Sequence, residues 1–110
     1  MTWNNIDSIE SLDFLIKNSF TTPQFIFKHS TRCSISSMAK NRLESKWDIN
    51  ENILNPYYLD LLSFRTISDE IAHRFSIEHE SPQILIIKNG ACVYFSSHTD
   101  INVFDIKEHI

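Results

Sequence analysis

The sequence predicts one α/β domain, residues 1–110, built on a mixed four-stranded sheet with helices on both faces. Apolar residues recur at helical spacing in some segments and form short unbroken runs in others, and the two kinds of segment alternate along the chain. Near the C-terminus, Asn89-Gly90 joins two apolar runs, which is a strong signal for a β-hairpin. Alternation implies parallel strands with right-handed crossovers, and the hairpin adds an antiparallel pair.

Composition and charge exclude several classes of protein. The chain has 110 residues, 42% of them hydrophobic, so it can bury a core without disulfides or a structural metal. Its formal net charge is -4, whereas a nucleic-acid-binding protein needs a basic face, so we expect no nucleic-acid partner. No apolar stretch approaches the roughly 20 residues that span a bilayer, and no signal peptide is recognisable. We therefore expect a cytoplasmic protein without a membrane partner, whose two cysteines are reduced.

The first half of the chain predicts two helices that flank a strand. Asp7 or Ser8 is expected to cap the first helix, and Gln24–His29 is a short apolar strand. Cys33 follows at the junction with a second helix, which is predicted from Ser34 to about Trp47. One side of this helix is expected to be apolar and to carry Ile35, Met38, Ala39 and Leu43.

The second half adds a strand, a helix, a hairpin of two strands and a last helix. The predicted segments are Tyr57–Leu62, Ile67–Phe75, Ile84–Ile87, Ala91–Ser96 and a helix through Val103, Phe104 and Ile106. Thr99 or Asp100 is expected to cap the last helix. Six phenylalanines are assigned to the core and two tryptophans to its rim: Phe25, Phe27, Phe64, Phe75, Phe95, Phe104, Trp3 and Trp47. This order of elements resembles that of the thioredoxin fold.

Cys33 is the candidate functional residue because it lies where a strand meets a helix. A thiol reacts as its thiolate, and the first free N–H groups of a helix stabilise negative charge. Ser36 follows three residues later, within reach to donate a hydrogen bond to the sulfur, and Arg32 adds positive potential. These features favour a reactive thiol. The alternative interpretation is that a lone cysteine is a small buried apolar residue.

The last residue of the motif Cys33-Ser34-Ile35-Ser36 decides the type of thiol chemistry. Ser36 stands where a dithiol protein has its second cysteine, so the motif holds no resolving thiol. The predicted mechanism is therefore that of a monothiol thiol-disulfide oxidoreductase. Cys33 attacks a mixed disulfide and takes the small thiol, which a second thiol molecule then removes.

Pro82 is the second candidate element. In thioredoxin-like folds a cis-proline opens the strand that faces the active cysteine, and the preceding residue offers backbone groups to an extended peptide or thiol ligand. Pro82 follows a polar loop and precedes an apolar run, so we predict a cis bond after Ser81. The predicted substrate-binding residues are Arg32, Ser34, Ser81 and Pro82.

Three segments carry a resemblance to one family. Lys28-His29-Ser30-Thr31-Arg32-Cys33-Ser34-Ile35-Ser36 resembles the active segment of the YtxJ-type monothiol bacilliredoxins, whose pattern is Lys-His-Ser-x-x-Cys-Pro-Ile-Ser. His79-Glu80-Ser81-Pro82-Gln83 is similar to their second signature, and Ser97-His98 to a shorter third one. The likeness runs from Trp3 to about Ile106.

The resemblance implies a thioredoxin fold and a role in the bacillithiol system. It implies that Cys33 removes bacillithiol, or a similar low-molecular-weight thiol, from S-thiolated proteins, and that Ser81 and Pro82 contact the substrate. The small thiol acts as a co-substrate, and no bound cofactor or metal is expected. Ser34 departs from the pattern, which has proline there; serine restores an N–H donor beside the sulfur and loosens the turn.

Two other functions remain open at this stage. A thioredoxin-like interaction domain without turnover is compatible with the missing second sulfur. An iron–sulfur carrier of the monothiol glutaredoxin kind is disfavoured, because such proteins have a Gly-Phe pair after the cysteine and glycine-rich thiol contacts later. Here Ser34-Ile35 follows the cysteine, and Gly90 is the only glycine.

The remaining chemistry-bearing residues are assigned to structure. Cys92 is expected to pack within its strand, with Tyr94 and Ser96 on the same side. Asp60 lies in an apolar strand and is assigned either to a buried position under the cysteine or to the surface. Five histidines lack paired metal-ligand spacing and are assigned as satisfied polar residues: His29, His73, His79, His98 and His109.

Overall fold

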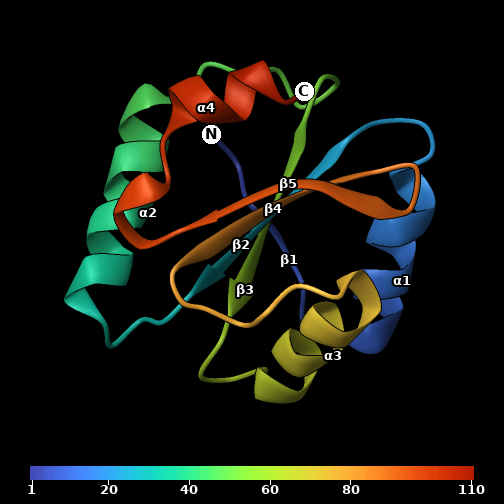
Figure 1. The fold of residues 1–110 in the computed structure, drawn as a ribbon, viewed down its shortest axis with the longest axis horizontal. Coiled ribbons are helices and arrows are strands. Elements are labelled where there is room, and N and C mark those ends of the chain that lie inside the picture. The colour runs from blue at the N-terminus through green and yellow to red at the C-terminus, as the bar shows by residue number, and fades with distance from the viewer.

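The computed structural model describes all of residues 1–110, and its elements follow the predicted order with one strand added. In chain order these are β1 (Asn4–Asn5), α1 (Ile9–Asn18), β2 (Gln24–His29), α2 (Ser34–Lys46), β3 (Asn55–Asp60), α3 (Arg65–Phe75), β4 (Gln83–Lys88), β5 (Ala91–Ser97), the short 3-10 helix η1 (His98–Asp100) and α4 (Val103–Glu108). Figure 1 shows this arrangement.

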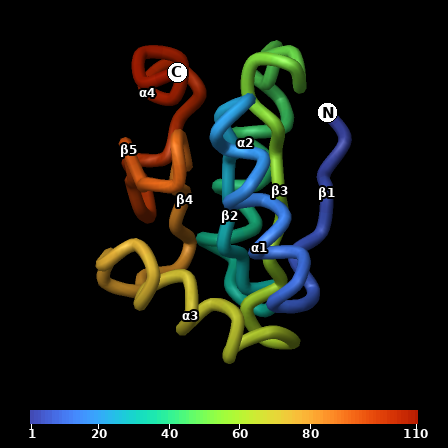
Figure 2. The backbone as a smooth tube through the Cα atoms, turned by 90° about the vertical axis from the view of Figure 1, so that its right-hand side faces the viewer, coloured from blue at the N-terminus to red at the C-terminus, as the bar shows by residue number.

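The strands form one mixed sheet in the order β1-β3-β2-β4-β5, which Figure 2 shows from the side of α1. β1, β3 and β2 run parallel, and β4 and β5 are antiparallel to their neighbours. The prediction of a mixed sheet is confirmed, with five strands instead of four. β1 was missed because it has only two residues, both exposed, and pairs through its backbone with Tyr57 and Tyr58. Such a strand leaves no apolar pattern in the sequence.

Helices cover both faces of the sheet (Figures 1 and 2). α1 and α3 enclose a first cluster of buried residues, namely Ile6, Leu12, Leu15, Ile26, Tyr57, Leu59, Ile67, Ile71, Leu85 and Ile87. α2 and α4 enclose a second cluster on the opposite face, namely Phe25, Phe27, Ala39, Leu43, Leu54, Ile84, Ile86, Ile101, Val103 and Ile106. β2 and β4 contribute to both clusters because successive residues of a strand point to opposite faces.

The helix caps agree with the sequence at one end of the chain and differ at the other. Ser8 caps α1, and its hydroxyl accepts the N–H of Ser11 at 3.0 Å in a reciprocal capping box. The predicted cap of the last helix at Thr99 or Asp100 is wrong. Both residues lie in η1, and Asn102 caps α4 by accepting the N–H of Asp105 at 2.8 Å.

Four of the six phenylalanines assigned to the core pack into it. Phe25 and Phe27 are fully buried, and two others are partly buried against the first cluster, namely Phe64 and Phe75. The core assignments of Phe95 and Phe104 are wrong, because these residues are 51% and 72% exposed. Phe95 lies on β5, the strand at one edge of the sheet. α4 has only six residues and buries Val103 and Ile106. Phe104 therefore points outward.

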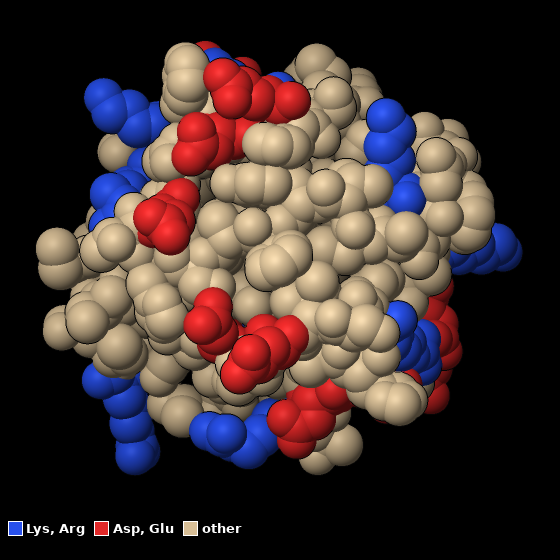
Figure 3. Space-filling view, in the orientation of Figure 1, with Lys and Arg blue, Asp and Glu red and all other residues tan.

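The charge distribution on one face and the character of the helices bear on possible partners. On the face seen in Figure 3, acidic and basic side chains lie around a broad uncharged centre, without an extended basic area. None of the helices combines the length and the apolar character needed to cross a membrane.

Candidate functional site

Cys33 is the N-cap residue of α2, at the edge of the sheet where β2 ends. Its backbone is extended (φ -104°, ψ 121°), and its carbonyl accepts the N–H of Ser37 at 3.0 Å. No side chain caps α2, so the other N–H groups of its first turn remain free to face negative charge. The thiol is neither in a disulfide nor fully buried. The predicted position at a strand–helix junction is therefore confirmed.

Ser36 is fully buried, and its hydroxyl is bonded away from the sulfur. Oγ lies 2.6 Å from Nδ1 of His29, and it accepts the N–H of Ser30 at 3.1 Å. The expected hydrogen bond from this hydroxyl to Cys33 is absent. The reason is that β2 ends with the buried ring of His29, close to the first turn of α2, and this ring accepts the hydrogen bond from the Ser36 hydroxyl.

His29 is the partner that the sequence did not pair with Ser36. Its ring is 4% exposed and packs against Phe27 and Tyr58, with centroids 5.5 Å from each. Burial lowers the pKa of His29, and the ammonium of Lys40 lowers it further. The ring is therefore neutral at pH 7, and Nδ1 accepts the hydroxyl proton. The two residues are seven apart across a loop, a spacing that no helix or strand periodicity reveals.

The Ser81–Pro82 segment lies at the same edge of the sheet as the end of β2. The peptide bond between these residues is cis, and the Pro82 carbonyl accepts the N–H of His98 at 2.9 Å. β4 begins at the next residue and runs antiparallel to β2, so its first residue, Gln83, pairs with Lys28 near the end of β2. The hydroxyl of Ser81 is buried without a hydrogen-bond partner. The fold thus brings both predicted segments to one edge.

The surface around Cys33 is exposed and partly apolar. Arg32 and Ser34 are exposed on either side of the cysteine. The prediction that Ile35 and Met38 share one side of α2 with Ala39 and Leu43 is wrong, because Ile35 and Met38 are 53% and 61% exposed while the other two are buried. α2 instead buries Ser36, Ala39 and Leu43, which are spaced as one face of a helix. Because Ser36 takes a buried position of this face, the side of α2 that faces the sheet differs from the side that its hydrophobic residues predict.

Cys92 lies far from Cys33 and on the other face of the sheet from α2. It pairs with Ile87, which pairs with Gln24 at the start of β2, whereas Cys33 follows the end of β2. The length of β2 alone is about 16 Å at roughly 3.3 Å per residue. A disulfide tolerates a Cα separation of at most about 7 Å. Cys92 therefore has no route to Cys33, as its assignment to packing requires.

A β-bulge changes the predicted side of Cys92. The register of β4 and β5 shifts between Ile86 and Ile87, so Cys92 packs on the first cluster while Tyr94 packs on the second. The expectation that both lie on one side is therefore wrong, because the extra residue in the bulge reverses the alternation. Burial raises the pKa of the Cys92 thiol, so this thiol is a poor nucleophile at pH 7.

Asp60 is placed by the turn that follows β3. Asp60 accepts hydrogen bonds from the Leu62 N–H at 3.2 Å and the Ser63 hydroxyl at 2.9 Å, so it closes the turn after β3. No group of three His, Cys, Asp or Glu side chains is arranged to hold a metal ion.

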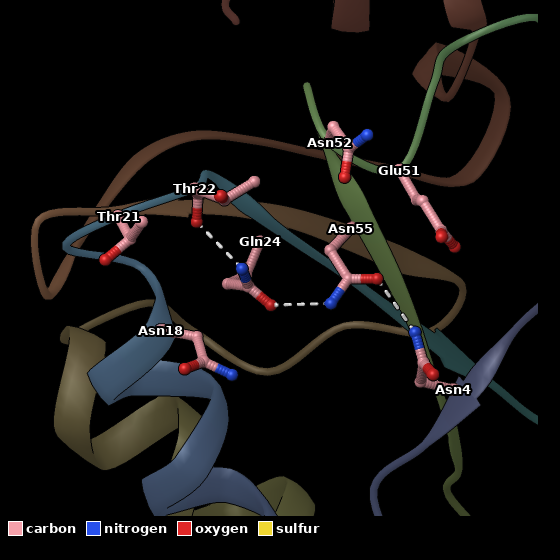
Figure 4. A pocket seen from close by; sticks show the side chains of 8 residues that line it. All are labelled: Asn4, Asn18, Thr21, Thr22, Gln24, Glu51, Asn52 and Asn55. Atoms are coloured by element: carbon pink, nitrogen blue, oxygen red, sulfur yellow. Dashed lines mark hydrogen bonds between the residues drawn. The ribbon is translucent and has the colours of Figure 1, made fainter.

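A polar pocket occupies the opposite edge of the sheet (Figure 4). It is lined entirely by polar side chains, namely Asn4, Asn18, Thr21, Thr22, Gln24, Glu51, Asn52 and Asn55. Gln24 and Asn55 begin β2 and β3, whereas Cys33 follows the end of β2. The amides bond to one another, with Asn55 donating to Gln24 at 3.2 Å and Asn4 donating to Asn55 at 2.8 Å. This pocket is separate from the thiol site and its amides are largely self-satisfied.

Comparisons with known proteins agree with this geometry. A family model described as monothiol bacilliredoxin BrxC matches residues 4–106. A solved structure described by its thioredoxin fold is 32% identical, with a TM-score of 0.81 over 96% of this chain and 90% of that one. The thioredoxin from Malassezia sympodialis is 17% identical, with a TM-score of 0.78 over 98% of this chain and 90% of that one.

A thioredoxin from Trypanosoma brucei brucei is 11% identical, with a TM-score of 0.75 over 97% of this chain and 92% of that one. At such low identity the two thioredoxins bear on the fold alone. The family model carries the assignment, because it spans nearly the whole chain, including the Cys33 and Pro82 segments. The chain therefore belongs to the monothiol bacilliredoxin family, and its role is in thiol redox chemistry.

Proposed function

We propose that this protein removes bacillithiol, or a similar low-molecular-weight thiol, from S-thiolated proteins, with Cys33 as the nucleophile. The observation that carries the proposal is the partly exposed thiol of Cys33 at the uncapped start of α2, with a buried, hydrogen-bonded Ser36 in the last position of the motif. Within the monothiol bacilliredoxin family this arrangement fits thiol-disulfide exchange without an internal resolving step.

The reaction has two exchanges. The Cys33 thiolate attacks the sulfur of the small thiol in the mixed disulfide. A disulfide forms between Cys33 and the small thiol, the old disulfide breaks, and the client cysteine leaves as a thiolate that takes a proton from water. A second molecule of the small thiol, as its thiolate, then attacks the small-thiol sulfur on Cys33. This attack releases the Cys33 thiolate and a symmetrical small-thiol disulfide.

The distribution of residues around the thiol supports a protein client. Ile35 and Met38 are exposed apolar side chains on the first turns of α2, beside the cysteine. Apolar side chains at a surface are typical of macromolecular contacts rather than of recognition of a small polar thiol. On the other side, the Ser81–Pro82 segment directly precedes β4 and supplies backbone groups for an extended chain. A client segment would lie between these two elements, with its modified cysteine at Cys33.

The test compares three proteins on one substrate: the unmodified chain, the Cys33→Ser variant and the Cys92→Ser variant. Each is incubated with a small reporter protein that carries one bacillithiol mixed disulfide, in the presence of free bacillithiol. Loss of the adduct from the reporter is followed by intact mass. We expect turnover by the unmodified chain and by Cys92→Ser, and none by Cys33→Ser. Cys92→Ser is the matched control, because that thiol is remote from the site.

Two results would count against the proposal. Equal turnover by Cys33→Ser would place the chemistry elsewhere. Absence of turnover by a folded unmodified chain, with binding of the reporter retained, would support the interaction-domain function instead.

A further inference from the structure

A buried lysine lies on the α3 side of the sheet, behind the loop that carries the cis-proline. Lys28 is fully buried in β2, and its Nζ lies 3.3 Å from the carbonyl of Ser68 in α3 and 3.4 Å from Nδ1 of His79. The hydroxyl of Ser68 lies 3.3 Å from Nδ1 of His79. An ammonium has only donors, so Nδ1 of His79 is the acceptor and the ring carries its proton on Nε2.

A second buried side chain reaches the same loop from the same face. Gln83 pairs directly with Lys28 across β2 and β4, and cross-strand partners point to one face of the sheet. Its Nε2 donates to the carbonyl of Glu78 at 3.0 Å, and the residue is fully buried. Lys28 and Gln83 therefore bind two successive residues of the loop, Glu78 and His79, which precede Ser81 and Pro82. We call Lys28, Ser68, His79 and Gln83 the loop anchor.

The charges around the loop anchor do not neutralise Lys28. Burial lowers its pKa to about 8, and Asp69 on α3 raises it only in part. Burial also lowers the pKa of His79, and Lys28 lowers it further. Arg65 on α3 acts in the same direction on His79, and Asp69 and Glu80 oppose it. At pH 7 the contact therefore joins a charged Lys28 to a neutral His79.

A buried ammonium without a close carboxylate is costly, and an apolar side chain of the same size would pack there without that cost. The energetic cost of this ammonium points to a role other than stability. The contacts supply one, because Lys28 joins the strand that leads to Cys33 to the loop that leads to Pro82.

We propose that Lys28 is a positioning residue, whose buried ammonium holds His79 and thereby fixes the Ser81–Pro82 segment in the geometry that receives the substrate. The proposal rests on the proposed function, since that function makes Ser81–Pro82 the substrate-binding segment. Loss of the Lys28 proton replaces a charged donor to His79 with an uncharged and weaker one, and protonation of His79 removes the acceptor. The segment is therefore held in a window of pH that has its upper limit near 8. Outside that window the affinity for the substrate falls. The intrinsic reactivity of the Cys33 thiol does not fall with it.

Two reactions separate positioning from thiol reactivity. Alkylation of Cys33 by iodoacetamide, in a Cys92→Ser background, reports the thiol alone. Exchange with a peptide that carries a bacillithiol mixed disulfide also requires the Ser81–Pro82 segment. The ratio of the two rate constants is measured from about pH 5.5 to about pH 9.5, a range that covers ordinary histidine and the shifted lysine. The variants are Lys28→Met and His79→Gln, with exposed controls Lys17→Met and His73→Gln.

For the unmodified chain we expect the ratio to fall on both sides of the window. Lys28→Met should lower the ratio about tenfold at pH 7, mainly through KM, and should remove the fall above pH 8. His79→Gln keeps an acceptor that does not take up a proton, so it should remove only the fall at low pH. The two control variants should match the unmodified chain. An unchanged ratio and an unchanged pH profile in Lys28→Met would overturn the proposal.

Hydrogen exchange of the amides in the loop 77–81 tests the anchor without any substrate. Protection there should fall in Lys28→Met and, in the unmodified chain, above pH 8. If the unmodified chain does not react with the mixed disulfide, and the Lys28→Met variant shows less protection of loop 77–81 than the unmodified chain, the proposed function is wrong and the anchor stands. If it reacts, and protection is the same in both proteins, the anchor is wrong and the proposed function stands.

Discussion

The hydroxyl of Ser36 lies 2.6 Å from Nδ1 of His29, so the serine that ends the Cys-X-X-Ser motif faces into the protein and away from the sulfur. Through Oγ, which also accepts the Ser30 N–H, this residue closes the loop between β2 and α2. In this protein the serine is therefore part of the scaffold that presents Cys33, and the free N–H groups of α2 are left to act on the thiolate.

Replacing Ser36 with alanine should destabilise the fold without slowing alkylation of Cys33. The change leaves the Ser30 N–H and a buried ring nitrogen without partners, which costs about 1 to 3 kcal/mol of unfolding free energy. Urea unfolding measures this cost, with Ser37→Ala as the control, since that side chain makes no hydrogen bond within the protein. A Ser36→Ala variant as stable as the control would show that the contact with His29 adds nothing.

Replacing Ser34 with proline should make the thiol less reactive while leaving the fold intact. Ser34 is exposed at the first position of α2, where the backbone of proline fits a helix. Proline removes one of the free N–H groups beside the sulfur, so the rate of alkylation of Cys33 at pH 7 should fall. Ser34→Ala keeps the N–H and should alkylate at the original rate. Equal rates for the proline and alanine variants would exclude a role for this N–H.

The order of the elements could be predicted because strong local signals mark it. The Asn89-Gly90 turn, the run Ile84–Ile87 and the cap at Ser8 each act through nearby residues, and each lies where the sequence places it. β1 could not be predicted, because a two-residue strand is specified by its neighbour β3 and not by its own side chains. The bulge beside Ile87 is likewise a property of the pairing of two strands.

The position of the candidate site was predictable, but its internal contacts were not. A cysteine after an apolar strand and before a helix is a local pattern, and Cys33 lies there. The contact between His29 and Ser36 depends on how α2 sits on the end of β2, so the hydroxyl was assigned to the wrong partner. The burial of Lys28 could not be predicted from the pattern around it, because its partner His79 is far along the chain.

Lys28 should make the stability of the protein depend on pH in the alkaline range. Burial lowers its folded pKa to about 8, while an unfolded lysine titrates near 10.4. Between these values the unfolded state binds more protons, so unfolding free energy rises with pH. Urea unfolding of the unmodified chain and Lys28→Met at several alkaline pH values measures the effect. The unmodified chain should gain stability relative to Lys28→Met as pH rises through this interval; parallel curves would show that Lys28 titrates normally.

Replacing Gly90 with alanine should destabilise the hairpin for two separable reasons. Gly90 has φ +78°, where an alanine costs about 1 to 3 kcal/mol. A Cβ would also lie 2.8 Å from the Phe20 ring, next to Ser19, whose hydroxyl accepts the Gly90 N–H at 2.9 Å. In a Phe20→Ala background only the backbone cost should remain, so the loss measured by thermal unfolding should become smaller. An identical loss in both backgrounds would contradict the steric contribution.

The central claim is that Cys33 alone carries the exchange, and the position of a small-thiol adduct tests it most directly. The reduced chain is incubated with bacillithiol disulfide, and intact mass with fragmentation locates the product. We predict one adduct per chain, on Cys33, that added bacillithiol removes, and none on Cys92, whose thiol has a raised pKa and is remote from the site. An adduct on Cys92 with Cys33 unmodified would contradict the account.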